Sequence, residues 1–152
     1  MNALQAITDT LADGASKFTR WANHMTQDDL EGYFHEEQGE KIAAAFYAAT
    51  NLSHAVAVSK CWPKVEAGTR IALMHSELSE MLEGVRKGKK DDHIPSRSAV
   101  EVEAADLLHR LFDFAGEYDL DLGGAYIEKG LYNLKRADHK PENRVKAGGK
   151  KF

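Results

Sequence analysis

The sequence predicts an all-α protein, most simply a helical bundle. Apolar residues recur at helical spacing along most of the 152 residues, and no segment shows the alternation expected of a β-strand. The chain has only three prolines, and Pro63, Pro95 and Pro141 each stand where a helical pattern has just stopped. The length is that of a single domain with a core of its own. Helices packed through their apolar stripes are the simplest fold for such a chain.

The N-terminal part predicts a helix over residues 3–25 and a second over residues 41–60. Between them, Thr26 followed by Asp29 resembles a capping box, in which each side chain bonds the backbone of the other residue. The helix over residues 41–60 is rich in alanine and ends before Pro63. Its apolar stripe consists of Ile42, Phe46, Ala49, Leu52 and Val56.

The C-terminal part predicts three more helices. Ser98 and Glu101 form a capping box that starts the middle one, which extends to about Tyr118. The last helix covers residues 122–137. The first covers residues 69–86, and its apolar stripe consists of Ile71, Met74, Leu78, Met81, Leu82 and Val85.

The composition is that of a soluble globular protein, with 43% apolar and 29% charged residues. No apolar run approaches the ~20 residues that span a membrane, and the N-terminus has no signal-peptide pattern. The single cysteine, Cys61, rules out an internal disulfide and suits a reducing compartment. We therefore expect a cytoplasmic protein that does not bind a membrane.

Two pairs of acidic residues are the most informative feature of the sequence. Glu77 and Glu80 lie three residues apart on one predicted helix, and Glu103 and Asp106 have the same spacing on the next. Residues three apart share a helix face, so four carboxylates converge if the helices pack side by side. Like charges ~4 Å apart repel by ~4 kcal/mol per pair at an effective dielectric constant of ~20, so such a cluster needs protonation, solvent exposure or a cation. Carboxylate oxygens suit hard cations, Mg²⁺ or Mn²⁺.

The last predicted helix carries a polar stripe of Lys129, Asn133 and Arg136. Two cations and an amide on one face suit phosphate oxygens. From Lys129 onwards the chain has eight Lys or Arg residues and two acidic ones, although its net charge is −4. A solvated basic tail would give the same pattern. An acidic metal site with a basic tail favours an anionic ligand carried with a metal, such as a nucleotide.

In this order and spacing the motifs resemble the MazG-like all-α nucleoside triphosphate pyrophosphohydrolases. The two acidic pairs are separated by 22 residues and followed by the Lys-Asn-Arg stripe. The resemblance covers residues 52–151, and residues 71–80 and 137–144 look like phage and bacterial members in particular. Residues 1–50 do not fit the minimal pattern. The expected domain division is therefore an N-terminal helical extension over 1–50, packed on the same domain, and a catalytic bundle over 51–152.

The resemblance implies hydrolysis of a (deoxy)nucleoside triphosphate to the monophosphate and pyrophosphate. The metal ligands and catalytic residues would be the four carboxylates of Glu77, Glu80, Glu103 and Asp106. They would hold Mg²⁺, for which Mn²⁺ could substitute. Lys129, Asn133 and Arg136 would bind phosphates. Asn51, His54 and Trp62 are the candidates for contacting the base.

The resemblance also implies a homodimer or homotetramer in a bacterial or phage-infected cytoplasm. A phage-type role in the deoxynucleotide pool, including hydrolysis of dGTP or another purine nucleotide, and the removal of damaged nucleotides both stay open.

Two other classes of protein fit part of the pattern. A di-iron carboxylate bundle also places acids inside helices, but it requires Glu-x-x-His on two of them. Here only Asp106 and His109 approximate that motif. The second class is a non-enzymatic helical protein that binds metal or nucleic acid through its basic tail. The negative net charge argues against nucleic acid as a partner.

Overall fold

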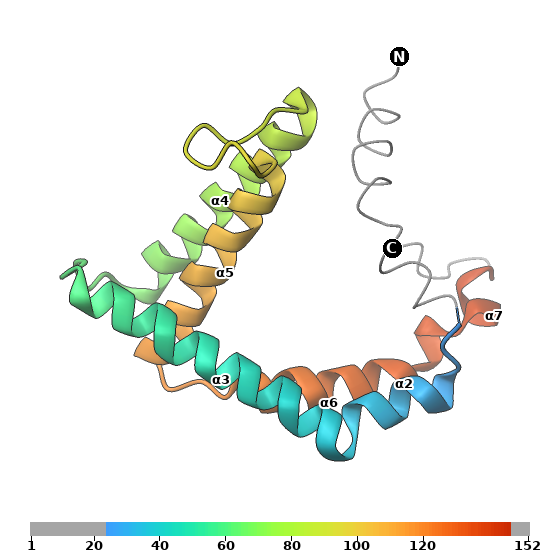
Figure 1. The fold of residues 1–152 in the computed structure, drawn as a ribbon. Helices are drawn as coiled ribbons and strands as arrows, with labels where there is room; N and C mark the ends of the chain where they lie inside the picture. Colours follow the sequence, from blue (N-terminus) through green and yellow to red (C-terminus); the bar gives the residue numbers. More distant parts are fainter. Residues whose placement is uncertain (1–23, 147–152) are drawn as a thin grey trace. The chain divides into compact units, whose positions relative to one another are not determined.

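The protein is all-α, as predicted. The structure, a computed structural model, describes residues 24–146, and most of the helix expected over residues 3–25 lies outside this part. The described helices are α2 (Gln27–Phe34), α3 (Glu36–Ser59), α4 (Ala67–Lys87), α5 (Ala99–Glu117), α6 (Leu122–Lys135), the 3-10 turn η1 (Ala137–His139) and α7 (Pro141–Arg144) (Figure 1). Over these residues no strand is present, and one isolated β-bridge joins Lys90 to Ser98.

The chain divides into two compact units. In the described part, the first unit contains residues 49–120, and the second contains residues 25–48 and 121–146. Helix α3 contributes its first half to the second unit and its second half to the first. The division expected at residue 50 thus falls inside a continuous helix.

The first unit is built around the α4–α5 hairpin, whose helices run side by side (Figure 1). Helix α4 ends at Gly88, which has a positive φ of 59° and donates its N–H to the carbonyl of Gly84. Helix α5 starts with the predicted capping box: the Ser98 hydroxyl accepts from the Glu101 N–H, and the Glu101 carboxylate accepts from the Ser98 N–H. These two caps fix where the acidic pairs stand along the hairpin.

The apolar stripe of α4 is covered only in part by the described residues, with Met74, Met81 and Val85 half-buried. Ile71, Leu78 and Leu82 are exposed, while Glu77 and Gly84 are the buried residues of this helix. The reason is that α4 approaches α5 through small residues: a Cβ atom on Gly84 would stand 3.1 Å from the Ala99 Cβ. The close contact at Gly84 and Ala99 thus leaves part of the apolar stripe of α4 exposed.

Helix α3 also leaves part of its apolar stripe exposed. Leu52 and Val56 of its predicted stripe are exposed, whereas Ser53 and Ala57 are buried. The Ser53 hydroxyl lies 3.0 Å from Nδ1 of His109 in α5 and forms a hydrogen bond with it. A polar contact and small side chains, rather than a leucine stripe, thus hold this half of α3 on the hairpin.

Helix α3 is also the one described helix that is long and apolar enough to cross a membrane. The qualifying segment is Glu37–Ser59, of which 11% is buried in the structure, and core helices of soluble proteins pass the same test.

The second unit packs α6 against α2 and the first half of α3. The Phe34 ring lies beside Gly130, where a Cβ atom would meet it. Phe46 and Tyr126 stack with ring centroids 5.0 Å apart. The predicted capping box of Thr26 and Asp29 is confirmed at the start of α2. The sequence patterns did not predict η1 and α7, the short turns after α6.

Candidate functional site

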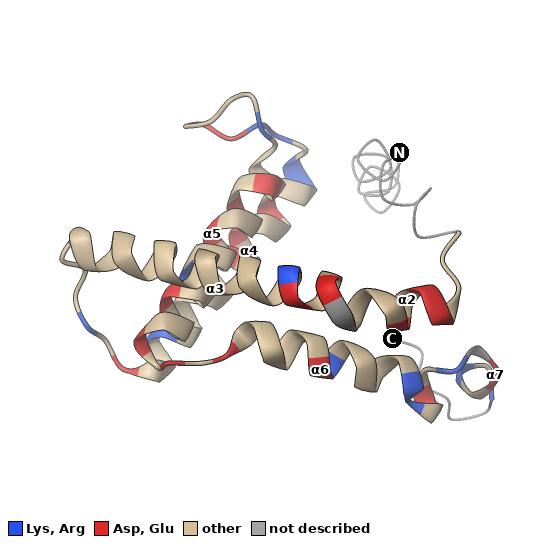
Figure 2. Ribbon diagram, turned by 60° about the horizontal axis from the view of Figure 1, so that its bottom comes forward, with Lys and Arg blue, Asp and Glu red and all other residues tan. Residues whose placement is uncertain are grey.

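Three of the four predicted metal ligands come together on the α4–α5 hairpin. Glu77, Glu80 and Glu103 each offer a carboxylate oxygen, and these atoms all lie within 4.8 Å of one another. Figure 2 shows acidic residues on both helices of the hairpin. Glu77 is buried, Glu103 is half-buried and Glu80 is exposed. We call these residues the acidic cluster, and oxygen donors so close together could hold a metal ion.

Uncompensated negative charge is concentrated at Glu103. Burial raises the pKa of this carboxyl above its ordinary value, and the neighbouring carboxylates of Glu80, Glu77, Asp106 and Asp91 raise it further. Protonation or a bound cation would relieve this repulsion. The cluster therefore has the charge as well as the donor atoms of a cation site.

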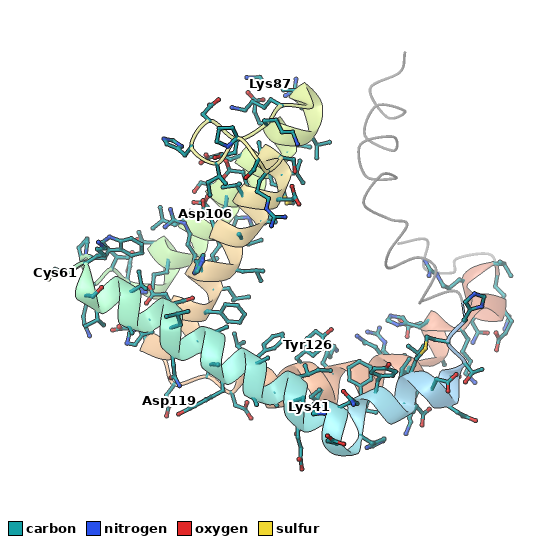
Figure 3. All side chains as sticks on the ribbon, in the orientation of Figure 1. Lys41, Cys61, Lys87, Asp106, Asp119 and Tyr126 are labelled. Atoms are coloured by element: carbon teal, nitrogen blue, oxygen red, sulfur yellow. The ribbon has the colours of Figure 1, made fainter. Side chains whose placement is uncertain are left out.

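Asp106, the fourth predicted ligand, stands beside the cluster without being one of its three converging groups. It is exposed on α5, three residues after Glu103, and contributes to the field that raises the Glu103 pKa. Figure 3 labels Asp106 on the hairpin, on the side of Lys87, the last residue of α4.

Asp91, a further acid near Glu103, was missed in the sequence. It lies in the loop between α4 and α5, where its carboxylate accepts hydrogen bonds from the N–H groups of His93 and Ile94. These hydrogen bonds lower the pKa of Asp91. A loop acid has no helical register, so no spacing rule could have placed it beside the acidic pairs.

Arg110 is a second residue missed in the sequence. Its Nε donates to Oε1 of Glu77 at 2.6 Å, so a cation from α5 already pairs with the buried member of the acidic cluster. The sequence signal was its position four residues after Asp106, one helical turn along the same face.

A pocket of about 400 Å³ adjoins the cluster in the same unit. The end of α3 and the following loop form one side of it, and residues of α4 and α5 form the other. Apolar and polar residues both line the pocket. The apolar or weakly polar ones are Ala57, Val58, Cys61, Trp62, Pro63, Val65 and Leu73, and the polar or charged ones are His54, Lys64, Arg70, Arg110, Asp113 and Glu117. This mixture is typical of sites for small organic molecules.

The polar side of the pocket is ordered by Asp113. One of its oxygens accepts from Nη1 of Arg70 at 2.7 Å, and the other lies 2.9 Å from Nδ1 of His54. Because a carboxylate only accepts, Nδ1 of His54 carries the proton in this bond. The Nε2 of His54 is then the nitrogen available as an acceptor.

Of the three candidates for contacting a base, His54 and Trp62 line the pocket, and Asn51 does not. Asn51 is exposed on α3, three residues before His54. The Trp62 side chain is 59% exposed although it lines the pocket, so much of its indole face is open to a planar partner.

The predicted phosphate-binding residues lie in α6 and at its end, in the second unit. The Lys129 ammonium lies 4.8 Å from the centre of the Tyr132 ring, and the Arg136 guanidinium 5.6 Å. Both cations thus contact one aromatic ring. Arg136 caps the helix and forms two hydrogen bonds with Asp138, which raise the pKa of Arg136 and lower that of Asp138. The amide oxygen of Asn133 is buried, with no hydrogen-bond partner among the described residues.

No protein-family model, no curated protein and no solved structure matches this chain. The function is therefore inferred from the site itself and from the sequence motifs.

Proposed function

We propose that this protein is a Mg²⁺-dependent nucleoside triphosphate pyrophosphohydrolase of the MazG-like type. It would convert a (deoxy)nucleoside triphosphate to the monophosphate and pyrophosphate through attack of water on the α-phosphorus. The observation that carries the proposal is the convergence of Glu77, Glu80 and Glu103, with ligand oxygens within 4.8 Å, from two helices in the spacing of that family. The resemblance adds Asp106 as the fourth ligand.

The donor set and its charge fit a hard divalent cation. All donors are carboxylate oxygens, which Mg²⁺ and Mn²⁺ prefer, and the pKa of Glu103 is raised by burial and by the neighbouring carboxylates. When bound, the metal would neutralise phosphate charge and lower the pKa of a bound water. The chain's own part is to hold the carboxylates in place. The helix caps at Gly88 and Ser98 do so by fixing the register of the hairpin.

The pocket beside the cluster would receive the base. Trp62 offers an indole face for stacking, and stacking of a base on an aromatic side chain is worth ~1–3 kcal/mol. His54 and Arg70, held by Asp113, offer polar groups that can read a base edge. A phosphorylated nucleoside has the matching chemistry, a planar heterocycle at one end and metal-binding phosphates at the other.

Lys129, Asn133 and Arg136 are proposed to bind the phosphates that leave as pyrophosphate. Their support is the resemblance and their chemistry: two cations on one aromatic ring and a buried amide oxygen without a partner in the described part.

The deciding experiment is to incubate the protein with each dNTP and Mg²⁺ and to resolve pyrophosphate from orthophosphate. We expect pyrophosphate and the monophosphate in equal amounts from at least one nucleotide, and none when EDTA replaces Mg²⁺. Release of orthophosphate alone would point to attack on the γ-phosphorus and reject the proposal. So would the absence of any product at protein concentrations where the nucleotide binds.

The alternatives have less support. For a di-iron bundle, His109 would have to face the acids, but its Nδ1 bonds Ser53 on α3. Anaerobic iron loading would test this class, and we expect no absorption band. A nucleic-acid-binding role predicts salt-sensitive binding to DNA that does not depend on Glu77 or Glu80.

We further propose that the protein forms a homodimer or homotetramer. The described part buries few apolar side chains, and those that are buried in its core are the small residues Ala57, Ala99 and Ala115. Larger apolar side chains on α4, among them Ile71, Leu78 and Leu82, are exposed at helical spacing. Burial of such surface contributes roughly 25 cal/mol per Å². A second copy of the chain would cover the apolar surface that the described residues leave exposed.

A further inference from the structure

Arg110 joins the two parts of the candidate site. Its Nε donates to Oε1 of Glu77 at 2.6 Å, and the same side chain lines the pocket. The Glu77 side chain is 7% exposed and that of Arg110 is 38% exposed. One end of this ion pair is therefore fixed inside the hairpin, and the other can reach solvent.

The ion pair supplies a counter-charge for the buried carboxylate of Glu77. A buried carboxylate among other carboxylates is strongly unfavourable without a counter-charge. Among the described residues, Arg110 is the one cation that forms an ion pair with the acidic cluster. A metal ion held by Glu77, Glu80 and Glu103 would supply the same counter-charge, so the metal and Arg110 compete for Glu77.

The position of Arg110 also suggests what it binds once it leaves Glu77. A nucleotide with its base in the pocket and its phosphates on the acidic cluster must pass the wall that contains Arg110. A guanidinium offers a planar set of N–H donors that matches phosphate oxygens and stays charged at all physiological pH values. A cation at this point would meet the phosphate nearest the nucleoside.

We propose that Arg110 is a stand-in counter-ion. It neutralises Glu77 in the metal-free protein and exchanges this partner for a substrate phosphate when the metal–nucleotide binds. This inference rests on the proposed function, because it takes the acidic cluster as the metal site and a nucleotide as the substrate. It assigns Arg110 two opposite effects: it weakens binding of the free metal and strengthens binding of the metal–nucleotide.

The test measures both effects in Arg110→Met, which keeps the length of the side chain and removes its charge. Free Mn²⁺ is titrated by electron paramagnetic resonance, first alone and then with the α,β-methylene analogue of each dNTP. We expect Arg110→Met to bind Mn²⁺ alone about tenfold more tightly, the order of change expected on removing a neighbouring unit charge at a partly exposed site. We expect it to bind the Mn²⁺–nucleotide analogue about tenfold or more weakly.

Arg97→Met is the matched control. Arg97 lies in the loop just before the N-cap of the same helix and pairs with the exposed Glu101 at 3.3 Å, so the variant loses the same charge outside the acidic cluster. We expect neither affinity to change in this variant. In Arg110→Lys, which keeps the charge, Mn²⁺ affinity should stay near that of the wild type while binding of the analogue weakens.

In Arg110→Met the affinity for Mn²⁺ alone should rise while the affinity for the Mn²⁺–nucleotide analogue falls. A damaged fold would weaken both affinities, so this pattern separates the proposed role from a structural one. Unchanged or weaker binding of Mn²⁺ alone by a folded Arg110→Met overturns the proposal, and so does unchanged binding of the analogue. If Arg110→Met does not fold, binding of the nucleotide analogue to Arg110→Lys is the deciding measurement, and unchanged binding overturns the proposal. If Mn²⁺ binding tightens as expected and no dNTP yields pyrophosphate, the counter-ion role stands and the proposed hydrolysis fails. Absence of Mn²⁺ binding in every variant overturns both.

Discussion

Gly116 in α5 lies directly against His54 in α3. A Cβ atom at position 116 would stand 2.6 Å from the His54 Cβ and 2.7 Å from its Cγ, distances that real side chains do not tolerate. The absence of a side chain at Gly116 therefore sets how closely α3 approaches the hairpin. It also positions His54, which lines the pocket and bonds Asp113.

Gly116→Ala should therefore destabilise the first unit. Because the clash is with the root of a side chain, we expect a loss of about 1–3 kcal/mol in the free energy of unfolding, as for other overpacked sites. Urea denaturation followed by circular dichroism measures this. Gly68→Ala is the control, since nothing lies within 4 Å of a Cβ there and alanine favours the helix. Equal stability of the two variants would contradict the packing described here.

Removal of a carboxylate from the metal site should abolish turnover without unfolding the protein. We expect Glu80→Gln and Asp106→Asn to lower the rate of pyrophosphate release by at least about 100-fold, the upper range found for residues that only support metal ligands. Both residues are exposed, so the helical circular dichroism should not change. Glu83→Gln is the control, because Glu83 is on the same helix but pairs with Lys87. Loss of activity in Glu83→Gln as well would argue against a defined ligand set.

The raised pKa of Glu103 predicts a dependence of stability on pH. Ionisation of this carboxyl disfavours the folded state, so its contribution is fully favourable below the ordinary pKa of 4.5 and is lost as the pH rises through the raised value. In EDTA, Glu103→Gln should match the wild type at about pH 4 and melt at a higher temperature at about pH 7. Thermal melts across this range measure the difference. If the melting temperatures of the two proteins change in the same way with pH, the electrostatic description of the cluster is refuted.

Trp62 should report on occupation of the pocket. The chain has two tryptophans, so Trp21→Phe leaves Trp62 as the single indole. We expect a dNTP analogue to quench its fluorescence, and Trp62→Ala to weaken binding by roughly 5–150-fold, the equivalent of ~1–3 kcal/mol of stacking. Trp62→Phe, which keeps an aromatic face, should bind with intermediate affinity. Full affinity in Trp62→Ala would place the base elsewhere.

The exposed apolar residues of α4 should mediate self-association. Leu82 is 56% exposed, and a charge at this position would be buried in an interface between copies. We expect the wild type to have two or four times the chain mass of 16.9 kDa in light scattering, and Leu82→Glu to shift to the monomer. Val145→Glu, at an exposed apolar residue of the other unit, is the control. A monomeric wild type would refute the proposal.

Local signals in the sequence were reliable because they depend on neighbours along the chain. The capping boxes at Thr26 and Ser98 and the ends of α4 and α5 follow from hydrogen bonds within a few residues. The convergence of Glu77, Glu80 and Glu103 needed one more assumption, that consecutive helices pack side by side, and this is confirmed.

The buried faces could not be predicted from periodicity. An apolar stripe identifies the side of a helix that avoids water, but it does not say whether the same chain covers it. Here Gly84 and Ala99 permit a close contact, and Leu78 and Leu82 stay exposed. The role of Arg110 was hidden for a similar reason: a cation on a helix surface has no distinctive spacing until the position of Glu77 is known.

Cys61 provides a site for chemical labelling in the pocket. It is the single cysteine of the sequence, its thiol is exposed, and it lines the same pocket as Trp62. A thiol-reactive fluorophore would attach at this one position in the unaltered protein, at the rim where we expect a base to enter. A panel of natural and damaged nucleotides could then be ranked by how far each slows the labelling reaction. Such a screen identifies the preferred base without requiring that the nucleotide be hydrolysed.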